Sequence, residues 1–90
     1  MQYISTRGQS SEVEFGEVLL AGLARDGGLY VPTVWPHLSH DDLRGLADLS
    51  YAGAAARILA PFMDEIEPDE LEEMTRAAYD VFADDSVVPL

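Results

Sequence analysis

Apolar residues recur at helical spacing over residues 15–23. The stripe consists of Phe15, Val18, Leu19, Gly22 and Leu23, which share one face of an α-helix. Just before it, Ser11 and Glu14 have the spacing of a capping box, which predicts a helix start. Arg25 suits the last helical turn, and either glycine of Gly27-Gly28 suits the left-handed residue that ends a helix.

Short β-prone stretches flank this predicted helix at residues 2–6 and 29–31. Pro32 and Pro36 stop the second stretch, because proline cannot continue a strand ladder. The helix can serve as the crossover between the two strands, and such a connection is typical of a parallel pair. The sequence therefore predicts an α+β fold with a minimal sheet of two short strands and about four helices.

The chain is helical in pattern from Ser39 onward. Ser39 is expected to cap a short helix, residues 51–62 form the next one, and Pro61 should bend or end it. Pro68 suits the first turn of a final helix. The apolar faces of these helices are Leu43, Leu46 and Ala47, then Ala55, Ile58, Leu59 and Phe62, then Leu71, Met74, Ala78 and Phe82.

Two apolar features lie outside the predicted helices. Trp35 stands between Pro32 and Pro36 and is expected to anchor a core or an interface. The closing run Val87–Leu90 is apolar, so we expect the natural chain to continue beyond it. No repeat or low-complexity linker divides residues 1–90, which indicates a single small domain.

The charge balance narrows the classes of partner. Seventeen acids face five arginines, giving a formal net charge of −12. This charge repels phosphate backbones and anionic lipid, so we expect no nucleic-acid and no membrane partner. Zero cysteines exclude disulfides and suit a reducing cytoplasm. No apolar run approaches membrane-spanning length.

One polar cluster has functional promise, the segment Ser5, Thr6, Arg7 and Gly8. Two hydroxyls, a guanidinium and a glycine that permits close backbone approach can hold a phosphate or carboxylate. They can equally lie at an interface. The structural alternative is a strand end whose arginine pairs with one of the acids. These four residues are the weak candidates for a phosphate or interface contact.

The other polar motifs favour structural roles. The segment His37–Asp42 has the residue types of a metal site but no second ligand cluster, and it also reads as an ordinary helix start. The acidic run 64–85 lacks the ligand pattern of an EF-hand and indicates a solvated face. Asp26–Gly28 is better explained by a helix end and tight turn than by a phosphate loop.

Two motifs in the first third of the chain resemble the start of threonine synthases. The first is Tyr-Ile-Ser-Thr-Arg-Gly at residues 3–8, and the second is Gly-Leu-Ala-Arg-Asp-Gly-Gly-Leu-Tyr-Val-Pro at residues 22–32. A Trp-Pro pair and an acidic final helix fit more loosely. The closing Val87–Leu90 resembles the junction where the family's chain enters its catalytic domains.

The resemblance implies a pyridoxal-phosphate enzyme of the tryptophan-synthase-like fold. It would convert O-phospho-L-homoserine and water into L-threonine and inorganic phosphate. In that family the coenzyme forms a Schiff base with a lysine of the following domain. All basic side chains here are arginines, which cannot form one.

No catalytic, cofactor-binding or metal residue is therefore carried over from the family. Residues 1–90 are expected to be a non-catalytic N-terminal domain whose partners are the catalytic domains of the same polypeptide. The alternative is a free-standing acidic helical module that binds proteins through its acidic face or a patch around Trp35. A complete small hydrolase or metal enzyme is a remote third.

Overall fold

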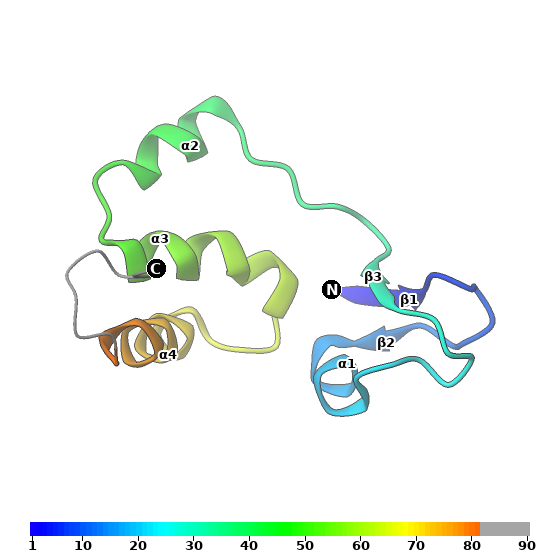
Figure 1. Ribbon diagram of the computed structural model, residues 1–90. Coiled ribbons are helices and arrows are strands. Elements are labelled where there is room, and N and C mark those ends of the chain that lie inside the picture. The colour runs from blue at the N-terminus through cyan, green and yellow to red at the C-terminus, as the bar shows by residue number, and fades with distance from the viewer. Residues whose placement is uncertain (82–90) are drawn as a thin grey trace. The chain divides into compact units, whose positions relative to one another are not determined.

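The computed structural model describes residues 1–81, which form two compact units (Figure 1). The first unit comprises Met1–His37 and Pro61–Glu65, and the second comprises Leu38–Ala60 and the described part of Ile66–Leu90. In chain order the elements are β1 (Gln2–Ser5), β2 (Val13–Glu14), α1 (Phe15–Ala21), β3 (Tyr30–Pro32), α2 (His40–Leu46), α3 (Tyr51–Leu59), the 3₁₀ turn η1 (Ala60–Met63) and α4 (Pro68–Asp80). The predicted α+β class with four α-helices is confirmed.

Three strands form the sheet of the first unit, one more than predicted, in the order β2-β1-β3 (Figure 1). Tyr3 of β1 faces Val13 on one side and Pro32 on the other, and both pairings are antiparallel. The predicted parallel pair is therefore wrong. The start of β3 is fixed beside the end of β1, because the Thr6 amide donates to the Leu29 carbonyl at 2.7 Å. From that point β3 runs back along β1, with Tyr30 opposite Ser5 and Val31 opposite Ile4.

Helix α1 begins directly after β2 and has no capping box. The predicted cap residue Ser11 lies outside the helix, and Glu14 at the N-cap position makes no side-chain capping bond. Strand pairing explains this, because the Glu14 carboxylate accepts a 2.5 Å hydrogen bond from the side-chain Nε2 of Gln2 across the sheet. The helix ends at Gly22, whose φ of 74° is left-handed, and so stops before the predicted Gly27-Gly28.

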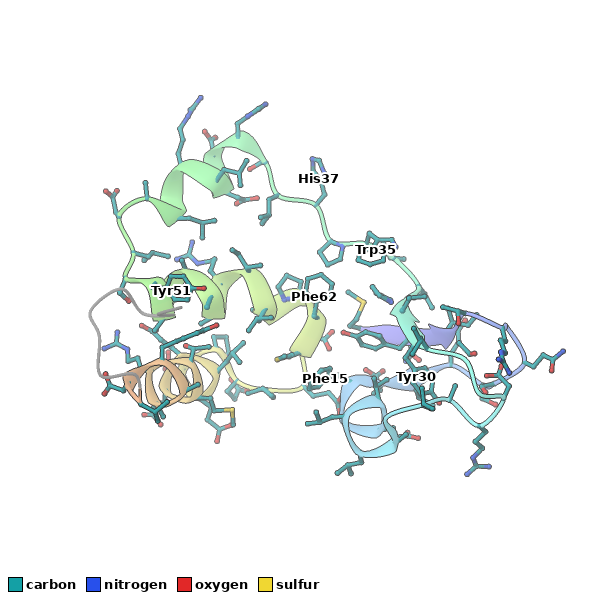
Figure 2. All side chains as sticks on the ribbon, in the orientation of Figure 1. Phe15, Tyr30, Trp35, His37, Tyr51 and Phe62 are labelled. Carbon is teal, nitrogen blue, oxygen red and sulfur yellow. The ribbon has the colours of Figure 1, made fainter. Side chains whose placement is uncertain are left out.

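The apolar stripe of α1 is not buried within the described residues. No residue of α1 is buried, and the side chains of Leu19 and Leu20 are 68% and 90% exposed. The core of the first unit centres instead on buried Tyr3. Its ring lies 6.2 Å from that of Phe15, and its hydroxyl donates to the Phe62 carbonyl at 2.5 Å; Phe15 and Phe62 are labelled in Figure 2. The first unit thus has a thin core and an open apolar helix.

The three helix starts predicted from the second half of the sequence are confirmed, and α3 begins at Tyr51 as expected. Ser39 caps α2 through a full capping box, in which its hydroxyl accepts from the Asp42 amide and the Asp42 carboxylate accepts from the Ser39 amide. Pro68 occupies the first turn of α4. The predicted change at Pro61 is also confirmed, since α3 gives way there to η1.

Helices α3 and α4 lie side by side in the second unit (Figure 1). The buried residues at their contact are Ala56 on α3 and Leu71 and Thr75 on α4. The Thr75 hydroxyl lies 2.9 Å from the Ala52 carbonyl of α3 and 2.9 Å from the Glu72 carbonyl of its own helix. A hydrogen bond therefore joins the two helices where periodicity alone predicts only apolar contact.

The predicted apolar face of α4 is wrong in part. Leu71 is buried, but Met74 and Ala78 are exposed, and Thr75 takes the buried position. Tyr79 also meets α3, since its ring lies 4.8 Å from that of Tyr51. Phe82 and Val87–Leu90 lie outside the described residues.

Candidate functional site

The candidate residues Ser5, Thr6, Arg7 and Gly8 form a tight turn at the end of β1. The Gly8 amide donates to the Ser5 carbonyl at 2.9 Å. Gly8 has a φ of 73°, a left-handed conformation that glycine adopts at no steric cost. The structure thus brings the four residues together and explains the glycine by turn geometry.

The polar centre of this turn is Asp26. Its Oδ1 accepts from the Ser5 hydroxyl at 2.7 Å and from the Gly28 amide at 2.9 Å, while its Oδ2 accepts from the Gln9 amide at 3.0 Å. Ser5 is only 3% exposed, and its oxygen also accepts from the Arg7 amide at 3.1 Å. One carboxylate therefore ties the loop after β1 to the turn before β3.

Hydrogen bonding lowers the pKa of Asp26 below its ordinary value. The largest contribution comes from the Ser5 hydroxyl, followed by the Gly28 amide. Smaller contributions come from the Gln9 amide and the charge of Arg7, while partial burial acts in the opposite direction. The carboxylate therefore stays ionised, and able to accept from all of its donors, to a lower pH than an ordinary aspartate.

The side chains of Thr6 and Arg7 are also engaged within the turn. The Thr6 hydroxyl oxygen accepts from the Leu29 amide at 3.0 Å, and Arg7 Nη1 donates to the main-chain carbonyl of Asp26 at 2.8 Å. Arg7 belongs to none of the ion pairs found in residues 1–81. The sequence predicted an ion pair between Arg7 and an acid as the structural alternative. The acid that Arg7 meets is Asp26, but Arg7 bonds to its main-chain oxygen and not to its carboxylate. The geometry therefore favours a structural role for this turn.

Gly28 is required by space rather than by conformation. A Cβ atom on Gly28 would lie 2.3 Å from Ser5 Oγ and 3.1 Å from both Arg7 N and Asp26 Oδ1. The 2.3 Å separation is shorter than side-chain carbon contacts allow, and the two 3.1 Å separations are tight. Sequence reasoning identified Asp26–Gly28 as a tight turn but missed Asp26 as its polar centre. The available signal was an aspartate two residues before a glycine, which is the pattern of an Asx-turn.

A hollow of about 650 Å³ lies beside this turn in the first unit. Its charged side chains are two acids, Glu17 and Asp26, and one arginine, Arg25. Its other walls are Gln9, Ser10, Ser11, Val13, Ala21, Leu23 and Tyr30. The hollow contains no amine or thiol that could act as a nucleophile.

The remaining candidate motifs have structural roles. In the segment His37–Asp42, Ser39 and Asp42 cap α2, and Asp41 pairs with Arg44 at 3.1 Å. Residues 1–81 contain no group of three or more side chains that could hold a metal ion. No helix in that range is long and apolar enough to cross a membrane.

Trp35 is a surface residue of the first unit. Its side chain is 68% exposed, and its ring meets that of Phe62 edge-on with centroids 6.4 Å apart (Figure 2). The core role expected for Trp35 is therefore wrong. The interface role stays a prediction.

The comparisons with known proteins point to one family. The family model described as "Threonine synthase N terminus" matches residues 2–79. This chain belongs to that family. The solved structure of pyridoxal-phosphate-bound threonine synthase from Brucella melitensis is similar over the whole chain, with 45% identity and a TM-score of 0.91. Threonine synthase from Escherichia coli is similar over 93% of the chain, with 29% identity and a TM-score of 0.84.

Curated relatives agree with the solved structures. Threonine synthase from Pseudomonas aeruginosa is 43% identical over the whole of this chain. The human protein named threonine synthase-like 2 is 38% identical, again over the whole chain. The chain covers 19% of the length of each of these relatives and 20% of each solved structure. It therefore spans about a fifth of the proteins that it matches.

Proposed function

We propose that this chain is the N-terminal domain of a threonine synthase. The whole enzyme is a pyridoxal-phosphate-dependent lyase that converts O-phospho-L-homoserine and water into L-threonine and inorganic phosphate. The observation that carries the proposal is the match of residues 2–79 to the N-terminal family model, with whole-chain similarity to about a fifth of longer threonine synthases.

The residues of this chain do not fit the coenzyme. Pyridoxal phosphate attaches to enzymes through a lysine amine, and the chain contains no lysine. The only primary amine is the α-amino group of Met1, which pairs with the carboxylates of Asp64 and Glu14. The hydrogen bond to Asp64 is the main cause that raises the pKa of this amine, which favours its protonated, non-nucleophilic form. We therefore place coenzyme binding in the remainder of the enzyme.

The role proposed for this domain is structural. The polar groups of Ser5, Thr6 and Arg7 are used to fold the turn around Asp26, which leaves them little capacity to bind a substrate. The partners of the domain are the catalytic domains of the same polypeptide, and O-phospho-L-homoserine is the substrate of the whole enzyme. We propose the cytoplasm as its compartment, in keeping with the absence of cysteine.

The test is an assay of the full-length protein that begins with this chain. We expect it to release one phosphate for each threonine formed when it is given the coenzyme and O-phospho-L-homoserine. The 90-residue chain should release none under the same conditions. A full-length protein that folds and holds the coenzyme but forms no threonine would contradict the proposal. A reading frame without a further lysine-bearing domain would favour the interaction-module alternative.

A further inference from the structure

We infer that the C-terminal end of α1 is the surface through which this domain docks on the catalytic body of its own polypeptide. The surface consists of Leu19, Leu20 and Leu23, and we call it the leucine edge. The inference rests on the proposed function, because it takes its partner from the longer enzyme. It adds which face of the domain makes the contact.

The leucine edge is exposed to an unusual degree for three large apolar side chains close together in the sequence. Leu19, Leu20 and Leu23 are 68%, 90% and 60% exposed. Leu19 and Leu20 lie in the last turn of α1, and Leu23 comes directly after Gly22, where the helix ends. Between Glu17 and Arg25 the chain carries no charged side chain. Contiguous exposed apolar surface of this kind marks a contact with another protein surface.

The charge distribution separates the two units of the chain. The first unit holds six acids and two arginines, for a net charge of −4, and the second holds eleven acids and three arginines, for a net charge of −8. Burying a surface of dense negative charge costs free energy because the charges lose their hydration. Burying an uncharged leucine cluster carries no such cost. The first unit is therefore the better suited of the two to be covered.

The leucine edge also continues into a concave surface. Ala21 and Leu23 form part of the wall of the 650 Å³ hollow, together with Val13 and Tyr30. An exposed apolar edge beside a hollow offers a partner surface both apolar area and a concavity to fill, and both contribute to specific association. The hollow is large enough to receive a side chain of the partner surface.

The occupant follows from the length of the relatives. The chain covers 19% of threonine synthase from Pseudomonas aeruginosa, so about four-fifths of such an enzyme lies outside it. A tethered partner has a high effective concentration, so it can cover an edge that would be too small to hold a free protein. The catalytic body of the same polypeptide is therefore the occupant to which we commit.

The test is thiol labelling of the full-length enzyme. The variant Leu20→Cys reports on the leucine edge, and Leu43→Cys is the matched control, because Leu43 is a half-exposed leucine of α2 in the second unit. Residues 1–90 contain no other cysteine. Trypsin releases the two positions in different peptides, residues 8–25 and 26–44, because it cuts after the arginines. Mass spectrometry of these peptides then follows each labelling rate separately.

We expect Leu20→Cys to react at least about tenfold more slowly in the native enzyme than in urea, whereas Leu43→Cys reacts within roughly threefold of its unfolded rate. The protection should not depend on enzyme concentration. Equal protection at both positions, or free labelling of Leu20→Cys, would overturn the inference. Protection that vanishes on dilution would also overturn it, because it would identify a second copy of the enzyme as the occupant.

Two further measurements separate the possible failures. Threonine formation by each variant shows that it is folded, and Leu19→Cys replaces Leu20→Cys if the latter is inactive. If the wild-type enzyme is active but the Leu20→Cys variant is labelled freely, the docking surface alone is contradicted. A wild-type enzyme that forms no threonine would contradict the proposed function, whatever the labelling shows.

Discussion

Replacing Gly28 by alanine tests the packing around Asp26 most sharply. The new Cβ would lie 2.3 Å from Ser5 Oγ, a separation that forces the hydroxyl or the backbone to move. Gly28 does not have a positive φ, unlike Gly8, Gly22 and Gly27, so the cost arises from crowding and not from backbone strain.

The size of the effect follows from two contributions. Forcing an extra carbon into a packed site costs about 1–3 kcal/mol. Displacing the Ser5 hydroxyl from Asp26, where it lies at 2.7 Å, costs about 1 kcal/mol more. We therefore expect Gly28→Ala to lower the free energy of unfolding by about 2–4 kcal/mol. This is most of the roughly 3–5 kcal/mol available to a domain of this size.

A double-mutant cycle with Ser5→Ala isolates the crowding. Ser5→Ala removes the atom that the new methyl group meets first, and by itself it should cost about 1–3 kcal/mol, since the partners of the hydroxyl lose a hydrogen bond. In that background the nearest remaining atoms lie 3.1 Å from the Gly28→Ala carbon. The added cost of Gly28→Ala should then fall to about 1 kcal/mol, and the difference is the coupling energy.

The assay is urea unfolding of the wild type, Ser5→Ala, Gly28→Ala and the double variant. Circular dichroism monitors the unfolding. The control is Gly45→Ala in α2, where a Cβ would meet only Arg57 Nη1, at 3.9 Å. Alanine is a better helix former than glycine, so this control should gain up to about 1 kcal/mol. Strictly additive effects of Ser5→Ala and Gly28→Ala would refute the reasoning. So would a Gly28→Ala protein as stable as the control.

Three further predictions concern single side chains. Because the pKa of Asp26 is lowered on folding, its stabilising effect is present above the unfolded value of about 3.9 and is lost as pH falls through the folded value. Asp26→Asn should flatten that acid-induced loss in urea titrations, and an unchanged pH dependence would contradict this. Thr75→Val should lower the free energy of unfolding by about 1 kcal/mol, because it removes the hydrogen bond to the Ala52 carbonyl; an unchanged urea midpoint would contradict it. In the full-length enzyme, Arg7→Ala should leave kcat and KM unchanged and cost about 1 kcal/mol of stability or less, whereas a tenfold rise in KM, about 1.4 kcal/mol, would reveal a phosphate contact.

Local patterns predicted the helices better than the sheet. The cap Ser39 and the first-turn Pro68 act within a few residues of themselves, and the structure has both in their predicted places. Strand direction is instead decided by contacts between segments far apart in the sequence, such as the Thr6–Leu29 hydrogen bond. Periodicity contains no information about such contacts, so the antiparallel pairing was missed.

The candidate site was predicted in part for the same reason. The Ser5–Gly8 turn was recognisable from its residue types, but the role of Asp26 depends on donors from Ser5, Gln9 and Gly28. The apolar stripe of α1 was also recognisable. Spacing identifies a face that favours burial, but it does not identify the surface that covers the face.

The central claim is that this chain is the part of a threonine synthase that does not hold the coenzyme. Borohydride reduction of the full-length enzyme with pyridoxal phosphate, followed by peptide mapping, tests it most directly. We predict one coenzyme per polypeptide, on a lysine outside residues 1–90, because this chain has no lysine. A stoichiometric adduct within residues 1–90, which could form only at the amino group of Met1, would contradict the account.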